Sequence, residues 1–188
     1  MGRPLIEPIL EHIDNSDFVV ADLTKINFNV VFEAGYAIGR NKRVFFTMNS
    51  GILNDARILS TIGIFDTFGY FNYENSEDLS RKIAESNGDK PLVTSYPKDI
   101  KNPVYVVELP RKNDAQTRII SRIKRARLRY RSFNAQEHIR LSGTAAIQHV
   151  ASSSGVVVPI AAQHVAGADI HNIRAAFVAG LGRRLITT

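Results

Sequence analysis

The sequence predicts an α/β protein that contains parallel sheet and is organised as two related copies. Short runs rich in β-branched and aromatic residues alternate with segments whose apolar residues recur at helical spacing, which is typical of βαβ units. These runs lack polar alternation, as expected of strands buried on both faces. The second half of the chain also repeats the pattern of the first.

The first copy is expected to span residues 1–101 and to open with an amphipathic helix. A buried strand then ends at Asp22, and the helix that follows ends near Gly39, a residue type that favours helix termination. A further amphipathic helix has Ser76 as its expected N-cap. The expected helices are 3–14, 29–39, 52–59 and 76–86, the strands are 17–22 and 43–49, and 63–73 is irregular or strand-like.

The second copy is expected to span residues 102–188. Prolines at 97 and 103 make residues 95–103 the best candidate for a linker between the copies. The expected strands are 104–110, 130–136, 155–160 and 183–188, and the expected helices are 114–129, 142–154 and 172–182.

A register between the halves supports duplication. Residues 14–23 match 152–161, and 28–47 match 171–188 with a short gap, so that Asn29 pairs with Asn172 and Gly39 with Gly182. A chance repeat of an apolar αβ pattern is the alternative. Glu33 falls opposite Ala176, so the second copy is degenerate. Each copy lacks elements that the other has, so the chain is expected to be a truncated piece of a longer protein.

Composition excludes several classes of protein. The 188 residues are 44% hydrophobic, which is enough for a core, and no run approaches the ~20 apolar residues of a membrane span. Glu7 and Glu11 interrupt the N-terminus where a signal peptide is apolar, so a cytoplasmic location is expected. The absence of cysteine excludes disulfides and thiolate chemistry. The five histidines are scattered without metal-ligand spacing, so no metal site is expected.

Polar residues gather where the first predicted strand meets the next helix. Asp22 ends the strand, and Asn27 and Asn29 open the helix, at the edge of a parallel sheet where ligands usually bind. The spacing of Asn29, Glu33 and Tyr36 places all three on one side of that helix. A carboxylate in an apolar helix needs a partner or a function, so Glu33 is the main candidate for a reactive group.

The segment SDFVVADLTKINFNVVFEAGYAIGRNKRVFF, residues 16–46, resembles the signature of the nucleoside 2-deoxyribosyltransferase-like group, which is related to Toll/interleukin-1 receptor (TIR) domains. The matching elements are an acid-ended strand with Asp-Leu-Thr, an Asn-x-Asn-Val turn and Glu-x-Gly-Tyr-Ala in the helix. The resemblance covers about residues 5–85, and the second copy echoes it faintly. It implies tandem flavodoxin-like units. Phe28 stands where the family usually has proline, and the family's first strand does not precede this segment.

The resemblance also implies a chemistry. In that group the helix glutamate attacks the anomeric carbon of a nucleoside, or assists cleavage of the nicotinamide–ribose bond of NAD in TIR domains. Glu33 is therefore the expected catalytic residue. Asp22, Asn27, Asn29 and Tyr36 are the expected substrate-binding residues. NAD or a nucleoside would be a substrate, and no cofactor is expected.

Alternatives remain open. The chain is either a nucleoside or nucleotide N-glycosyl enzyme or a non-catalytic nucleotide-sensing or assembly module in signalling or antiphage defence, the latter favoured by the degenerate copy. Expected partners are a small nucleotide or nucleoside and a second copy of the chain. The basic segment 111–131 makes nucleic acid a third, weaker candidate partner. The non-functional interpretation of this segment is a solvated helix face. No membrane partner is expected.

Overall fold

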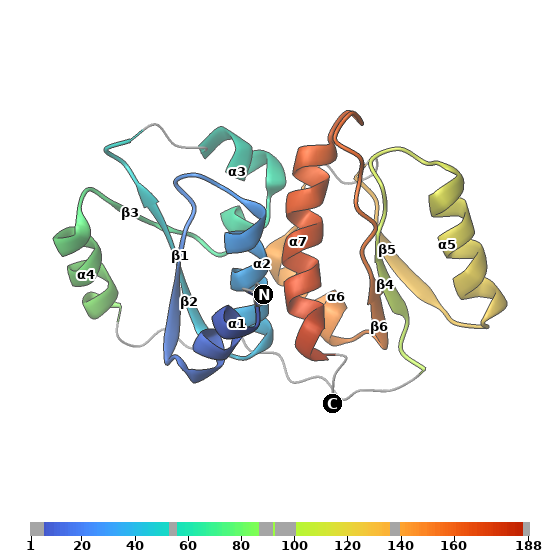
Figure 1. The fold of residues 1–188 in the computed structure, drawn as a ribbon, viewed down its shortest axis with the longest axis horizontal. Coiled ribbons are helices and arrows are strands. Elements are labelled where there is room, and N and C mark those ends of the chain that lie inside the picture. The colour runs from blue at the N-terminus through green and yellow to red at the C-terminus, as the bar shows by residue number, and fades with distance from the viewer. Residues whose placement is uncertain (1–5, 53–55, 87–91, 93–100, 136–139, 186–188) are drawn as a thin grey trace, which may run out of the picture.

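The computed structural model describes residues 6–52, 56–86, 92, 101–135 and 140–185. The chain forms an α/β structure with two small parallel sheets, one from each half (Figure 1). Seven helices are present in the described part of the chain. Several of them lie between the sheets, while α4 and α5 lie at the two outer ends of the molecule. This arrangement confirms the predicted α/β class with parallel sheet and is compatible with a flavodoxin-like fold, whereas the tandem copies stay a prediction.

The first sheet has the strand order β1-β2-β3, and its members are β1 (Phe18–Asp22), β2 (Arg43–Asn49) and β3 (Phe71–Tyr73). All pairs are parallel, with Asp22 opposite Thr47 in the register of β1 and β2. The helices of this half are α1 (Ile6–Asn15), α2 (Phe28–Gly39), α3 (Ala56–Ile62) and α4 (Ser76–Glu85), with a short 3-10 turn at Phe65–Thr67.

The second sheet has the order β5-β4-β6 and is also parallel. Its strands are β4 (Val104–Val107), β5 (Tyr130–Phe133) and β6 (Gly155–Val157). The central strand β4 is buried throughout, as its continuous apolar sequence predicts. The helices are α5 (Asp114–Arg125), α6 (Gly143–Ala151) and α7 (Ala168–Leu185).

The helices α2 and α7 are in backbone contact in the middle of the molecule. A Cβ built on Gly35 would lie 2.3 Å from the carbonyl oxygen of Phe177, and one on Gly39 would lie 2.9 Å from that of Leu181. Both contacts advance four residues along each helix in the same direction, so the helices run parallel. Glycine is required here because its missing side chain permits the close approach.

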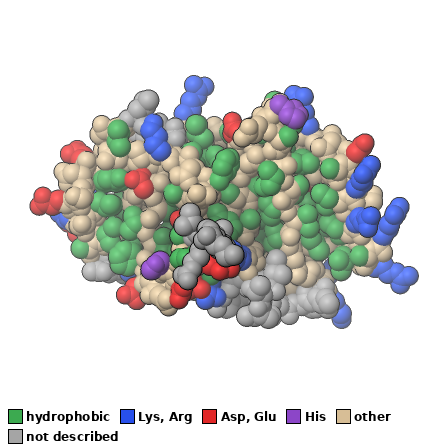
Figure 2. Space-filling model, in the orientation of Figure 1, with side chains coloured by type: hydrophobic (Ala, Val, Ile, Leu, Met, Phe, Trp, Pro, Cys, Tyr) green, Lys and Arg blue, Asp and Glu red, His purple; other side chains and the backbone are tan. Residues whose placement is uncertain are grey.

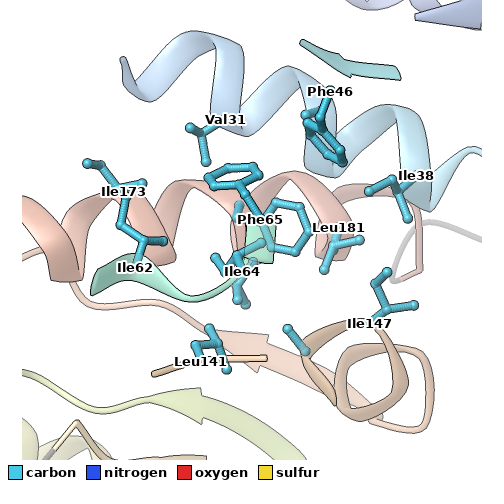
Figure 3. Packing of buried hydrophobic residues seen from close by; sticks show 14 of the residues in the cluster. Val31, Ile38, Phe46, Ile62, Ile64, Phe65, Leu141, Ile147, Ile173 and Leu181 are labelled. Carbon is cyan, nitrogen blue, oxygen red and sulfur yellow. The ribbon is translucent and has the colours of Figure 1, made fainter. Parts of the chain in front are cut away.

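One hydrophobic cluster spans the two halves. Phe65 packs edge-on against Phe46 and Phe177, with ring centroids 5.2 and 6.3 Å away. Figure 3 shows side chains from α2, α3, α6 and α7 converging on this region; those labelled include Val31, Ile38, Ile62, Ile147, Ile173 and Leu181. The predicted division of the chain into two copies at residues 101 and 102 stays a prediction. The hydrophobic core contains residues from both halves.

Buried Arg174 ties the halves together with polar contacts. Its side chain is 3% exposed and donates from Nε to the carbonyl oxygen of Ile62 at 3.1 Å and from Nη2 to that of Thr61 at 2.8 Å. The guanidinium therefore caps the C-terminal end of α3, where carbonyl groups lack helical partners. Burial lowers the pKa of Arg174 to about 10, which leaves it charged at neutral pH.

Several expected helix bounds shifted, as in α3, which was expected at 52–59 and lies at Ala56–Ile62, and two local predictions were wrong in kind. Ser76 is the first residue of α4, and the cap is Asn75, whose side chain accepts a hydrogen bond from the Asp78 backbone N–H at 2.9 Å. Residues 183–185 continue α7 instead of starting a strand, because Gly182 lies inside the helix and does not terminate it. Residues 186–188 and most of the expected linker lie outside the described residues.

None of the described helices combines the length and apolar character needed to cross a membrane.

Candidate functional site

Both sheets direct the carboxyl ends of their strands to the same edge of the molecule, at the top of Figure 1, where β1 leads into α2 and β6 leads towards α7. Ligands of open parallel sheets usually bind at this edge. The functional residues predicted from the sequence are therefore described from this edge inwards.

Asp22 ends β1 and lies in a polar cluster at this edge. Its carboxylate accepts a hydrogen bond from the Thr24 backbone N–H at 2.8 Å and one from the Tyr73 hydroxyl at 2.6 Å. Burial by itself raises the pKa of Asp22, but hydrogen bonds from the Thr24 side chain, Tyr73 and the Thr24 backbone outweigh it, so the pKa lies below its ordinary value. Asp22 is therefore an exposed, ionised hydrogen-bond acceptor at neutral pH.

Three members of this cluster were not predicted as site residues. Tyr73 ends β3, Asn49 ends β2, and buried Thr24 accepts a hydrogen bond from the Asn49 backbone N–H at 2.7 Å. A signal existed in the sequence, because Asn49 and Tyr73 are polar residues at the ends of apolar runs, as Asp22 is. The weak strand pattern around Tyr73 concealed it.

The first turn of α2 begins at the same edge. Asn27 is its N-cap, and its side-chain oxygen accepts a hydrogen bond from the Val30 backbone N–H at 3.0 Å. Asn29 is exposed on that turn, and its side chain has no hydrogen bond within the described part of the chain. Asn27 therefore has a structural role, whereas the Asn29 amide is available to a ligand.

Glu33 lies in the second turn of α2 and is half-buried. Burial raises the pKa of its carboxyl, and no hydrogen bond or ion pair to that carboxylate exists among the described residues. The two neighbours of Glu33 along the helix, Phe32 and Ala34, are partly and fully buried. An acid without a partner in such surroundings is costly for the fold, so it is the residue on α2 that most requires an explanation.

Tyr36 does not join the other predicted residues. It is 7% exposed, and its hydroxyl donates to the two carboxylate oxygens of Asp14 at 3.0 and 3.1 Å, while Arg40 forms an ion pair with the same carboxylate. Asp14 lies near the end of α1, just before β1 begins, so this contact is at the amino edge of the sheet. The helical rise places Tyr36 about 12 Å from the start of α2. Burial and the hydrogen bonds to Asp14 account for Tyr36 as a structural residue.

A pocket of about 430 Å³ lies at the carboxyl edge, on the side of the second half. Its walls come from the segment after β6 and from one side of α7, and Phe28 of α2 also lines it. In the register between the halves, Asn172 and Ala176 in this wall correspond to Asn29 and Glu33. Asn172 is used structurally, since its amide oxygen accepts from the Ala161 N–H at 2.8 Å and its amide nitrogen donates to the Ala161 carbonyl at 2.9 Å.

Comparisons of the chain with protein-family models, curated proteins and solved structures gave no match. Within the described ranges, no three His, Asp or Glu side chains are grouped so as to hold a metal ion. The site therefore has to be interpreted from its own geometry.

Proposed function

We propose that the first half of the chain cleaves or transfers the N-glycosyl bond of a nucleoside or nucleotide, NAD included, with Glu33 as the catalytic group. The observation that carries this proposal is the half-buried Glu33 carboxylate, which has no partner among the described residues and whose pKa is raised by burial. A structural carboxylate at such a position is normally hydrogen-bonded or paired.

The chemistry suits a carboxylate. As the C–N bond of the substrate breaks, positive charge develops at the anomeric carbon of the sugar, and the base leaves with the electron pair of that bond. Nicotinamide leaves NAD as a neutral base, whereas a purine or pyrimidine base takes up a proton from water as it leaves. Ionised Glu33 attacks that carbon and forms a glycosyl ester. Water or a second base then displaces the carboxylate, and the choice between them decides whether the reaction is hydrolysis or transfer.

The polar cluster supplies groups for binding. The Asp22 carboxylate is held ionised by its hydrogen bonds and accepts hydrogen bonds from sugar hydroxyls, which are donors. The free amide of Asn29, on the same helix as Glu33, offers both a donor and an acceptor. The N–H groups at the start of α2 favour a phosphate if the substrate is a nucleotide.

We also infer that the two halves are tandem copies of one flavodoxin-like unit. Such units have the strand order 2-1-3-4-5. The order β5-β4-β6 corresponds to strands 2-1-3, and β1-β2-β3 corresponds to strands 3-4-5. In this correspondence α2 and α7 are equivalent helices, in agreement with their parallel contact and with the register that pairs Asn29 with Asn172.

Release of the base tests the catalytic proposal. The protein is incubated separately with NAD and with 2′-deoxynucleosides, and the free base is measured by liquid chromatography. We expect release by the wild type and none by Glu33→Gln. The matched control is Glu11→Gln, the same substitution at an exposed position of α1, which should leave release unchanged. Equal release by Glu33→Gln and wild type would show that another group carries the reaction.

The pocket beside α7 favours a second candidate function, nucleotide sensing without turnover. Its wall has small alanines where the first half has Glu33 and Tyr36, which leaves an apolar space for a base. Here Ala176→Leu, which fills the pocket, should abolish nucleotide binding in calorimetry, whereas Glu33→Gln should not affect it. If Glu33 is catalytic, Glu33→Gln should abolish base release and Ala176→Leu should leave it unchanged. The two variants therefore separate the two functions.

A further inference from the structure

The outer helix α5 carries a cationic face that the proposed function does not use. Residues 111–131 contain nine Lys or Arg and a single acid, Asp114. All nine cations are exposed, and none of them forms an ion pair with a carboxylate in the described part of the chain. Figure 2 shows Lys and Arg side chains projecting from the end of the molecule where α5 lies.

The opposite face of α5 anchors the helix firmly. Ile123 is buried, and Ile119 and Ile120 pack with it against the outer side of the second sheet, near Val104 and Val106. The Asn113 side chain caps the first turn by accepting a hydrogen bond from the Gln116 N–H at 2.9 Å. The apolar stripe therefore faces inwards, and the positive face is held outwards on a rigid element.

Arginines at helical spacing form a cleft on the outward face. Arg118, Arg122 and Arg125 line it together with the hydroxyl residues Thr117 and Ser121, and its volume is about 230 Å³. The guanidinium groups of the three arginines have no hydrogen-bond partner within the described ranges. Spacings of four and three residues put them on one side of the helix, over about 10 Å of its axis. Guanidinium groups bind phosphate in a bidentate manner, and the Ser121 hydroxyl adds a donor, whereas the Thr117 hydroxyl donates to the Asn113 carbonyl oxygen at 3.2 Å.

The extent of the charge indicates a polymeric ligand. Beyond the cleft, Arg127, Arg129 and Arg131 continue the positive surface through the turn into β5. A single phosphate group neutralises only one or two cations, whereas a nucleic-acid strand presents a phosphate about every 3.4 Å of its axis. The isoleucines of α5 are turned to the sheet, so the helix lacks the outward apolar face with which amphipathic helices enter a lipid surface.

We propose that the outward face of α5, centred on Arg118, Arg122 and Arg125, binds the phosphate backbone of nucleic acid without sequence preference. This surface is at the far end of the second half from Glu33 and does not depend on any chemistry there. Contacts of this kind release counterions, so the affinity should fall steeply with salt.

The test is fluorescence anisotropy of labelled 20-base-pair DNA and 20-nucleotide RNA, titrated with the full chain between 50 and 200 mM KCl. The variant Arg118→Gln/Arg122→Gln/Arg125→Gln should bind at least about tenfold more weakly at the lowest salt. For duplex DNA, loss of three phosphate contacts should flatten the slope of log K against log salt by about 3. Circular dichroism checks that the triple variant is folded. If it is unfolded, the single variant Arg122→Glu replaces it in the same titration and should also bind more weakly.

The matched control removes the same charge elsewhere, with Lys25→Gln/Arg57→Gln/Arg81→Gln, all at exposed positions of the first half. We expect this control to bind as the wild type does. An equal loss in both triple variants would overturn the proposal, because net charge alone would then explain binding. Binding to vesicles with anionic lipid but not to nucleic acid, lost in the α5 variant, would overturn it in favour of a membrane surface.

Discussion

Gly180→Ala tests the contact between α2 and α7 on which the shared core depends. A Cβ at position 180 would lie 2.1 Å from the carbonyl oxygen of Phe32 and 2.8 Å from the backbone nitrogen of Tyr36. Real Cβ atoms essentially never approach heavy atoms below 3.0 Å, so the helices must separate by about 1 Å. The obstacle is backbone, which cannot rotate away as a side chain can.

The magnitude follows from two opposing effects. Overpacking a well-packed core typically costs 1–3 kcal/mol, and about 3 kcal/mol is expected here because both sides of the contact are backbone. Alanine regains about 1 kcal/mol over glycine in a helix interior. We therefore expect a loss of about 2 kcal/mol in the free energy of unfolding, which lowers Tm by about 4–8 °C for a chain of this size.

Urea unfolding followed by circular dichroism measures this loss. The control is Gly155→Ala in β6, where an added Cβ has no atom within 4 Å, and it should change the free energy of unfolding by less than about 0.5 kcal/mol. Because Phe32 and Tyr36 flank Glu33, Gly180→Ala should also reduce any base release. A Gly180→Ala protein as stable as the wild type would refute the close parallel packing of these helices.

Three further predictions concern single groups. Burial raises the pKa of Glu33, so the folded state holds its proton at pH values where the unfolded state has lost it, and the free energy of unfolding falls as pH rises above the ordinary pKa of glutamate. Glu33→Gln should therefore be more stable than wild type at pH 7 in urea unfolding, and the same difference at pH 4 would contradict this. Tyr73→Phe should raise the pKa of Asp22 in a carboxyl NMR titration, because a hydrogen bond to the ionised form is lost; an unshifted titration would argue against the contact. Asn75→Ala should cost about 1 kcal/mol of unfolding free energy, and Ser76→Ala less than about 0.5 kcal/mol; the opposite order would restore Ser76 as the cap.

The polar cluster and Glu33 place different physical demands on the fold. Asp22 is exposed and satisfied by hydrogen bonds, so its presence costs the folded state little. Glu33 is half-buried and has no partner among the described residues, so ionising its carboxyl destabilises the folded state. A stability cost confined to one group is typical of functional sites, and this contrast separates Glu33 from the other acids of the first half.

The sequence by itself determined the elements and their class. Apolar runs such as RVFFTMN predicted β2 within its observed bounds, because a strand buried on both faces requires a continuous apolar sequence. Helical spacing predicted α2 and α5 for the same local reason. The polar residues that end β1 and open α2 could likewise be placed at one edge, since the parallel arrangement fixes where strands end.

Only the tertiary structure decided which predicted residues stay together. Spacing put Tyr36 on the same side of the helix as Asn29, but α1 packs against that side and binds its hydroxyl through Asp14. Gly182 looked like a helix terminator, yet α7 continues through it against α2. Periodicity records which side of an element is apolar, and it contains no information about which distant segment covers that side, because packing partners are selected by the shape of the whole core.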